Sequence, residues 1–167
     1  MNHIRLATKE DASAISEVFA LSWKKAYRGM MSQHYLDHLA LDFWEKTLSE
    51  ELESGAVGAE VALEEGKVIG CIVYRKSRIT ALPEYAEIQA VYMHPDKIRK
   101  GYGQALLDSV LKTVKGMGYE GCYLWVLLGN NAARSFYEKN GFVGTKDYCK
   151  VMLEGQELMD ERMDYYF

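Results

Sequence analysis

The chain of 167 residues is predicted to form one mixed α/β domain, in which helices cover both faces of a mostly antiparallel sheet. Two observations support this prediction. Two β-rich segments, 59–64 and 67–75, are joined by Glu65-Gly66, a sequence typical of a tight hairpin turn. An amphipathic helical segment at about 102–117 then separates two apolar strands, which is how parallel neighbours are connected.

The other elements follow in order along the chain. Residues 3–7 alternate as a short strand, and Thr8 caps a helix at about 9–27. Ser32 and Asp42 are the expected N-caps of two further short helices. The remaining predicted segments are strands at 86–93 and 122–128, a helix at 131–140, and strands near 142–152 and 157–166.

Composition narrows the class of protein. No linker or repeat divides the chain, so a single domain is expected over residues 1–167. A net charge of −4 argues against a nucleic-acid binder. No segment has the length of a membrane span or the apolar core of a signal peptide, so we expect a cytoplasmic protein with no membrane partner. Cys71, Cys122 and Cys149 lie in apolar or strand-like segments and are expected to be reduced and buried.

The segment VYMHPDKIRKGYGQALLDSVLKTV carries the strongest functional signal. An apolar strand ends in it, and a loop with Gly101 and Gly103 leads directly into an amphipathic helix. Glycines let the backbone approach a ligand, while the free amides of the first helical turn favour an anion. Arg99 and Lys100 add positive charge. The pattern predicts a pyrophosphate site, with a plain strand-to-helix connection as the alternative.

Two other patterns are interpreted as structural. Gly116 to Gly121 match G-x-G-x-x-G, but they end a helix and precede a strand, the reverse of a dinucleotide-binding turn. His34 and His38 are four residues apart, but they lack the Glu of a zinc-protease helix and a third ligand nearby. No metal is therefore expected.

The segment LWVLLGNNAARSFYEKNGF contains a strand, a short helix and Tyr137 ahead of a Gly-Phe turn. V-Y-M-H-P followed by G-x-G-x-A-L-L, and then N-x-x-A-x-x-F-Y-E-K-x-G-F, resemble the two signature motifs of the GNAT N-acetyltransferase superfamily. The stretches S-W-K-K-A-Y-R-G-M-M and Y-L-D-H-L extend the resemblance over nearly the whole chain. It implies a GNAT-like sheet with a central parallel strand pair. Ile98 and Arg99 depart from the family's usual Arg or Gln and Gly, which leaves the shape of the loop open.

The resemblance also implies a ligand, acetyl-CoA as acetyl donor, and roles for individual residues. Tyr137 would be the general acid that protonates the leaving thiolate, and Asn130 would contact the cofactor where two strands separate. The acceptor pocket would be lined by Trp23, Tyr27 and Tyr35, for which core packing is the alternative. The pantetheine arm would pair with the backbone of Val91, Tyr92 and Met93. The pyrophosphate would be held by Arg99, Lys100, Gly101, Tyr102, Gly103 and Gln104.

A candidate base comes from strand periodicity. Glu87 and Gln89 fall on the same face of their strand, and Glu87 is the only acid that the sequence places near the expected reaction centre. We expect Glu87 to act as the base through water, with a solvent-exposed strand charge as the alternative.

The sequence therefore predicts an acyltransferase that moves an acetyl group from acetyl-CoA to a primary amine by direct attack in a ternary complex. The alternative is a catalytically idle GNAT-like module that binds acyl-CoA and acts as a sensor or binds a partner. The acceptor stays open among small amines, polyamines, antibiotics and protein or peptide amines. A C-terminal strand with Tyr165, Tyr166 and Phe167 offers an apolar edge that a homodimer would cover.

Overall fold

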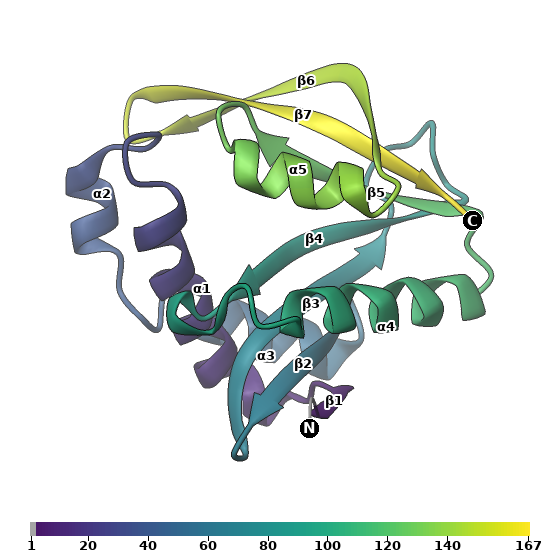
Figure 1. The fold of residues 1–167 in the computed structure, drawn as a ribbon, viewed down its shortest axis with the longest axis horizontal. Helices are drawn as coiled ribbons and strands as arrows, with labels where there is room; N and C mark the ends of the chain where they lie inside the picture. The colour runs from purple at the N-terminus through teal and green to yellow at the C-terminus, as the bar shows by residue number, and fades with distance from the viewer. Residues whose placement is uncertain (1–2) are drawn as a thin grey trace.

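The computed structural model describes residues 3–167 as one seven-stranded sheet with helices on both faces (Figure 1). The strand order is β1-β2-β3-β4-β5-β7-β6, and only the β4–β5 pair is parallel among the described strands. The predicted mixed sheet with a central parallel pair is confirmed. The elements are β1 (His3–Leu6), η1 (Lys9–Asp11), α1 (Ala12–Ala26), α2 (Gln33–His38), α3 (Glu45–Ser54), β2 (Gly58–Glu64), β3 (Lys67–Lys76), β4 (Tyr85–Met93), η2 (Pro95–Lys97), α4 (Tyr102–Gly116), β5 (Gly121–Leu127), α5 (Asn131–Lys139), β6 (Val143–Leu153) and β7 (Gln156–Tyr166).

The short helices begin partly at local caps and partly at a tertiary contact. The Ser32 hydroxyl accepts a hydrogen bond from the first turn of α2, which confirms the predicted cap. The expectation that Asp42 caps the next helix is wrong, because α3 begins at Glu45. The Trp44 amide at that helix start donates instead to the hydroxyl of Ser16 on α1, at 3.0 Å. A side chain distant in sequence replaces the local cap.

The hairpin of β2 and β3 forms at the predicted turn. Glu65 and Gly66 both have positive φ, 50° and 77°, as a two-residue turn with right-handed strand twist requires. β3 then pairs antiparallel with β4 along most of its length.

A bulge in β4 changes the face to which its side chains point. Val73 of β3 pairs with Ala90, and Tyr74 pairs with Ile88, so Gln89 is the extra residue. Ile88 packs in the apolar cluster beneath α4, whereas Ala90 packs in the cluster beneath α1 and α3. Strict alternation would have placed both side chains on one face. The bulge lets one strand serve both layers.

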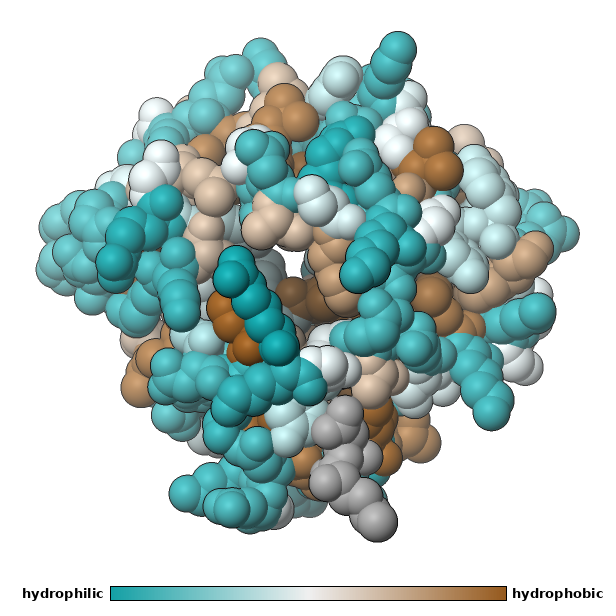
Figure 2. Space-filling view, viewed as in Figure 1, coloured by the Kyte–Doolittle hydropathy of each residue, from teal (hydrophilic) through white to brown (hydrophobic). Residues whose placement is uncertain are grey.

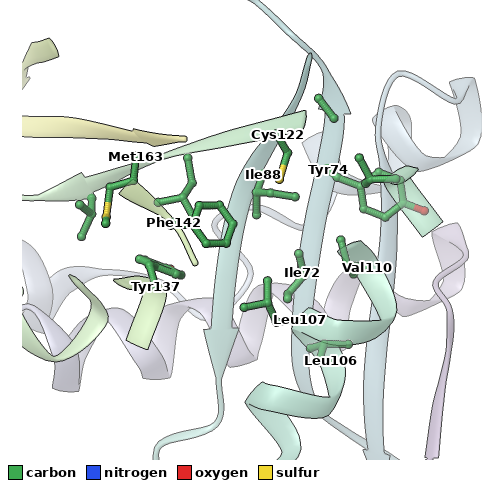
Figure 3. Packing of buried hydrophobic residues seen from close by; sticks show 14 of the residues in the cluster. Ile72, Tyr74, Ile88, Leu106, Leu107, Val110, Cys122, Tyr137, Phe142 and Met163 are labelled. Carbon is green, nitrogen blue, oxygen red and sulfur yellow. The ribbon is translucent and has the colours of Figure 1, made fainter. Parts of the chain in front are cut away.

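Both faces of the sheet are covered by apolar cores. On the α1 and α3 face, fully buried Ile15 and Val61 pack with Phe19 and Leu48. On the other face, side chains of α4, α5 and both halves of the sheet meet in a second cluster (Figure 3). Its labelled members are Ile72, Tyr74, Ile88, Leu106, Leu107, Val110, Cys122, Tyr137, Phe142 and Met163. Each large aliphatic side chain buried in this way contributes roughly 1.5–3 kcal/mol.

The C-terminal strands differ from the prediction in two respects. β7 lies between β5 and β6, so Tyr165 and Tyr166 do not form a sheet edge, and β6 is the edge strand instead. The apolar edge that suggested a homodimer at the C-terminus is therefore absent from β7. Cys71 and Cys122 are buried as expected, but Cys149 is exposed because it lies on this edge strand.

Candidate active site

β4 and β5 pair over a short distance and then separate. Residues 85–87 of β4 pair with residues 121–123 of β5, and no pairing continues beyond them. β4 stays bonded to β3, and the His94 amide still donates to a β3 carbonyl at 2.7 Å. Because alternate residues of a strand turn their amides the same way, those of Val91 and Met93 point to the free edge of β4.

Three adjoining pockets lie along this free edge. Figure 2 shows the face of Figure 1 hollowed near its middle, between α4 and α5. The seam pocket, of about 210 Å³, is lined by Ser22, Ala26, Tyr27, residues 88–92, residues 124–127, Asn130, Ala132, Ala133 and Tyr137. The outer pocket, of about 390 Å³, is lined by Ser22, Lys25, Ala26, Met30, Met93, Pro95, Ile98 and residues 129–132. The aromatic pocket, of about 420 Å³, is lined by Trp23, Tyr27, Met31, Arg78, Ile79, Glu87, Gln89, Tyr92, Tyr123, Trp125, Leu127, Cys149, Val151, Leu158 and Asp160.

The seam pocket connects the other two. It shares Tyr27, Gln89, Tyr92, Trp125 and Leu127 with the aromatic pocket. It shares Ser22, Ala26, Asn130 and Ala132 with the outer pocket. Two ligands that enter through the aromatic and outer pockets would therefore meet at the free edge of β4.

The start of α4 has the properties of an anion site. The first amides of the helix, from residues 102 to 104, have no intrahelical partner. Gly101 has a φ of 84°, and no side chain of the described residues caps the helix there. A side chain added at Gly103 would meet only Met93, with its Cβ 3.8 Å from Cγ, so the approach to these amides is open. Arg99 and Lys100 are exposed beside it. The geometry fits a pyrophosphate held by backbone amides.

Two side chains of this loop have structural partners. The Tyr102 hydroxyl donates to Glu64 on β2 at 2.7 Å. Gln104 donates to Asn140 at the end of α5, at 2.5 Å, and so ties the two helices together. These two residues therefore offer a ligand their backbone rather than their side chains.

Tyr137 lies on α5 and lines the seam pocket. The residue is 8% exposed, and its hydroxyl makes no hydrogen bond within residues 3–167. Burial raises the pKa of this hydroxyl, and the nearby Tyr92 adds to the effect. The group therefore keeps its proton at neutral pH and has no structural partner to give it to.

Glu87 lies in the wall of the aromatic pocket together with Gln89, so the shared strand face is confirmed. It is 4% exposed, which differs from an exposed strand charge. Both of its oxygens accept hydrogen bonds from the Arg78 guanidinium, at 2.6 and 2.8 Å. The hydroxyl of Tyr123 donates a third bond at 3.2 Å. Both oxygens of the carboxylate are thus held by protein donors, two of them from a charged guanidinium.

The expectation that Glu87 is the only acid in this region is wrong, because Asp160 lines the same pocket. Asp160 comes from β7, where it pairs with Leu127 of β5 and Cys149 of β6. Its carboxylate makes no hydrogen bond or ion pair with the residues from 3 to 167. Burial raises its pKa. Only the sheet order, in which β7 lies beside β5, brings this residue near Glu87.

The three aromatic residues predicted for the acceptor pocket have different positions. Trp23 and Tyr27 line the aromatic pocket and pack edge to face, with ring centroids 5.1 Å apart. The Tyr27 hydroxyl lies 3.2 Å from that of Tyr92. Tyr35 packs near Trp23, at 6.5 Å between centroids, but it is not among the residues that line the pocket. The structure therefore does not place Tyr35 in the lining of this pocket, in contrast to the prediction from the sequence.

Asn130 lies where β5 ends and α5 begins, in both the seam and outer pockets. Its side-chain oxygen accepts a hydrogen bond from the Ala133 amide at 3.3 Å, so it is the N-cap of α5. Its side-chain nitrogen makes no hydrogen bond within residues 3–167.

The known proteins that this chain resembles are described as acetyltransferases. Residues 13–142 match the model of the acetyltransferase (GNAT) family. A spermidine N(1)-acetyltransferase from Thermoplasma acidophilum is 30% identical over 145 residues, which cover 83% of this chain and 86% of that protein. The crystal structure of the PaiA N-acetyltransferase from Thermoplasma acidophilum in complex with coenzyme A has a TM-score of 0.77 at 24% identity, over 100% of this chain and 99% of that one. A ribosomal-protein-alanine N-acetyltransferase from Brucella melitensis gives a TM-score of 0.76 at 20% identity, over 99% of each chain.

Two further features of the described chain bear on its ligands and surroundings. From residue 3 onward, no group of three or more His, Cys, Asp or Glu side chains is arranged to hold a metal ion. Within the same range, no helix has both the length and the apolar character needed to cross a membrane.

Proposed function

Because the chain belongs to the GNAT family of acetyltransferases, we propose that it moves the acetyl group of acetyl-CoA to a primary amine by direct attack in a ternary complex. The observation that carries this proposal is the position of Tyr137. Tyr137 lines the seam pocket beside the free edge of β4, and its protonated hydroxyl has no hydrogen-bond partner within residues 3–167. A buried donor without a structural partner is suited to protonate a leaving group.

The residues along the free edge fit acetyl-CoA. The uncapped start of α4 would bind the pyrophosphate, with Arg99 and Lys100 adding charge. The amides of Val91 and Met93 would bind the pantetheine arm and the thioester oxygen, because no described strand pairs with them on that side. Bound acetyl-CoA would supply an activated acyl group at the junction of the seam and aromatic pockets.

The acceptor that fits the aromatic pocket best is a small cationic amine. Aromatic rings attract cations, and Trp23, Tyr27 and Trp125 line the pocket together with the carboxylate of Asp160, which has no ion-pair partner within residues 3–167. The Thermoplasma acidophilum relative is named for spermidine, which supports this class. We infer that polyamines are the preferred acceptors, ahead of peptide amines.

The test is a panel of acceptors at fixed acetyl-CoA, with the acetylated product measured by mass spectrometry. The panel contains putrescine, spermidine and spermine, with an alanine-initiated peptide, a free amino acid and an aminoglycoside as comparisons. We expect kcat/KM for at least one polyamine to exceed that for the peptide by tenfold or more. Product detection is preferable to a thiol reagent, because the exposed Cys149 would react with such a reagent.

Each other outcome of this panel is decisive. A peptide or aminoglycoside with the highest kcat/KM would overturn the polyamine assignment but leave acetyl transfer in place. If CoA raised the melting temperature while no amine was acetylated, the enzyme proposal would fail and the idle acyl-CoA-binding module would replace it.

A further inference from the structure

Asp160 lines the aromatic pocket, which adjoins the seam pocket where the two proposed substrates would meet. Its strand neighbour Leu127 lines both the aromatic and the seam pocket. Burial raises the pKa of Tyr27 and of Tyr92, and the charge of Asp160 contributes to both shifts. The carboxylate is therefore within electrostatic reach of the Tyr27–Tyr92 hydroxyl pair, which borders the seam pocket that Tyr137 also lines.

The two acids of the pocket differ in how their lone pairs are used. Glu87 accepts two hydrogen bonds from Arg78 and one from Tyr123. In the described part of the chain, Asp160 accepts none. A proton acceptor needs a free lone pair, and Glu87 has already used three of its about four lone-pair sites, whereas all those of Asp160 are open within residues 3–167.

The other ionisable groups around Asp160 do not neutralise it. The pocket brings Tyr27 from α1, Tyr92 and Glu87 from β4, Tyr123 from β5, Cys149 from β6 and Arg78 from the β3–β4 connection. Arg78 is engaged by Glu87. Arg162, two residues further along β7, is paired with Asp147 and Asp164, both at 2.9 Å. Within residues 3–167 Asp160 has no ion-pair partner, so an arriving ammonium group would not have to displace one.

We propose that Asp160, rather than the ion-paired Glu87, takes the proton that the acceptor amine loses before it attacks. This inference rests on the proposed acetyl transfer. The ammonium gives one proton to Asp160, directly or through water, and its nitrogen lone pair forms a C–N bond with the acetyl carbon. The C–S bond breaks, and Tyr137 gives its proton to the sulfur. The second proton lost by the nitrogen returns to Tyr137, and Asp160 releases the first to solvent.

The raised pKa of Asp160 supports this role, because a base works best when its pKa lies near the working pH. It also predicts an unusual stability effect. Between its unfolded and its folded pKa, such a carboxyl binds more protons in the folded chain than in the unfolded chain. The free energy of unfolding therefore falls as pH rises from the unfolded pKa to the folded pKa. At neutral pH, Asp160→Asn should therefore melt at the same or a higher temperature than the wild type.

The experiment compares pH profiles of kcat and melting temperatures for the wild type, Asp160→Asn, Glu87→Gln and Glu157→Gln, with the best polyamine of the panel as acceptor. Glu157 is the matched control, since it is an exposed acid on the same strand and does not line the pocket. We expect Asp160→Asn to lower kcat at neutral pH by about 10²-fold, with activity recovering toward the pKa of the amine. Glu87→Gln should keep the acid limb of the wild-type profile, which is the fall of kcat at low pH caused by protonation of the base. Glu157→Gln should match the wild type at every pH.

A wild-type acid limb in Asp160→Asn, together with its loss in Glu87→Gln, would overturn the inference and make Glu87 the base. A fall in activity that only follows a lower melting temperature of Asp160→Asn would also overturn it, because that pattern indicates a structural role. If the wild type itself acetylates no amine, the proposed function fails, and that failure is seen before any variant is tested.

Discussion

β4 and β5 pair at residues 85–87 and 121–123, the closed part of the seam, and separate beyond them, in the open part. The two parts differ in whether the hydroxyl of a buried tyrosine is hydrogen-bonded. In the closed part, the hydroxyl of Tyr123 interacts with Ser77, the backbone of Arg78 and Glu87, at 3.1–3.2 Å. In the open part, the hydroxyl of Tyr137 has no partner in residues 3–167. Both residues belong to the C-terminal half of the chain and both are less than 10% exposed.

The two parts of the seam therefore differ in role: the closed part stabilises the fold, and the open part leaves polar groups free to bind a ligand. Where the strands pair, polar groups satisfy one another and hold the two halves of the sheet together. Where the pairing stops, the amides of β4 and the hydroxyl of Tyr137 stay free for a ligand. Substitutions on the two sides of this boundary should therefore change different measurements.

The largest effect is expected for Tyr137→Phe. The ring and its packing against Phe142 are kept, while the only group proposed to protonate the thiolate is removed. kcat should fall by about 10²- to 10⁴-fold with little change in CoA affinity or melting temperature. Steady-state kinetics and thermal melting with and without CoA measure this. Full turnover combined with a lower melting temperature would show that the Tyr137 hydroxyl is structural, like that of Tyr123.

The next effect concerns the start of α4, on the open side of the boundary. Gly103→Asp places a carboxylate against the proposed pyrophosphate, whereas Gly103→Ala fits, because its Cβ would lie 3.8 Å from Met93. At a CoA concentration of about 100 times Kd, wild-type protection is about 2.7 kcal/mol. We expect Gly103→Ala to keep this protection and Gly103→Asp to lose it. Undiminished protection in a folded Gly103→Asp variant would place the cofactor elsewhere.

Tyr123→Phe is the counterpart of Tyr137→Phe in the closed part of the seam. Removing its hydroxyl leaves Glu87 and the Arg78 amide short of a hydrogen bond in a buried place. The expected loss is about 1–3 kcal/mol in the free energy of unfolding, measured by urea titration. kcat should change less than in Tyr137→Phe. The reverse ranking of the two variants in kcat would contradict the division between closed and open parts.

The smallest effect is expected at Asn130, at the boundary itself. Asn130→Ala removes the N-cap of α5 and should cost about 1 kcal/mol of stability. Asn130→Asp keeps a capping oxygen but adds a negative charge where the cofactor is proposed to lie. It should fold as stably as the wild type and bind CoA more weakly, as measured by calorimetry. If Asn130→Asp bound CoA as tightly as the wild type, Asn130 would only cap α5 and would not contact the cofactor.

Local sequence signals predicted most of the elements correctly. The Glu65-Gly66 turn, the Ser32 cap and the glycine start of α4 depend on backbone conformations that neighbouring residues dictate. The prediction failed at Asp42, where the helix start is capped by Ser16 from another helix. It also failed at Cys149, because no local pattern shows which strand will be the edge of the sheet.

The sequence by itself determined the mixed sheet and the glycine start of α4, because periodicity and glycine positions are properties of adjacent residues. The family resemblance of its motifs made Tyr137 the candidate acid. Only the tertiary structure decided which acid has a free carboxylate. β7 inserts beside β5 and carries Asp160 into the pocket, while the β3–β4 connection brings Arg78 onto Glu87. Such pairings depend on strand order and loop path, which couple residues far apart in the chain and leave no local pattern in the sequence.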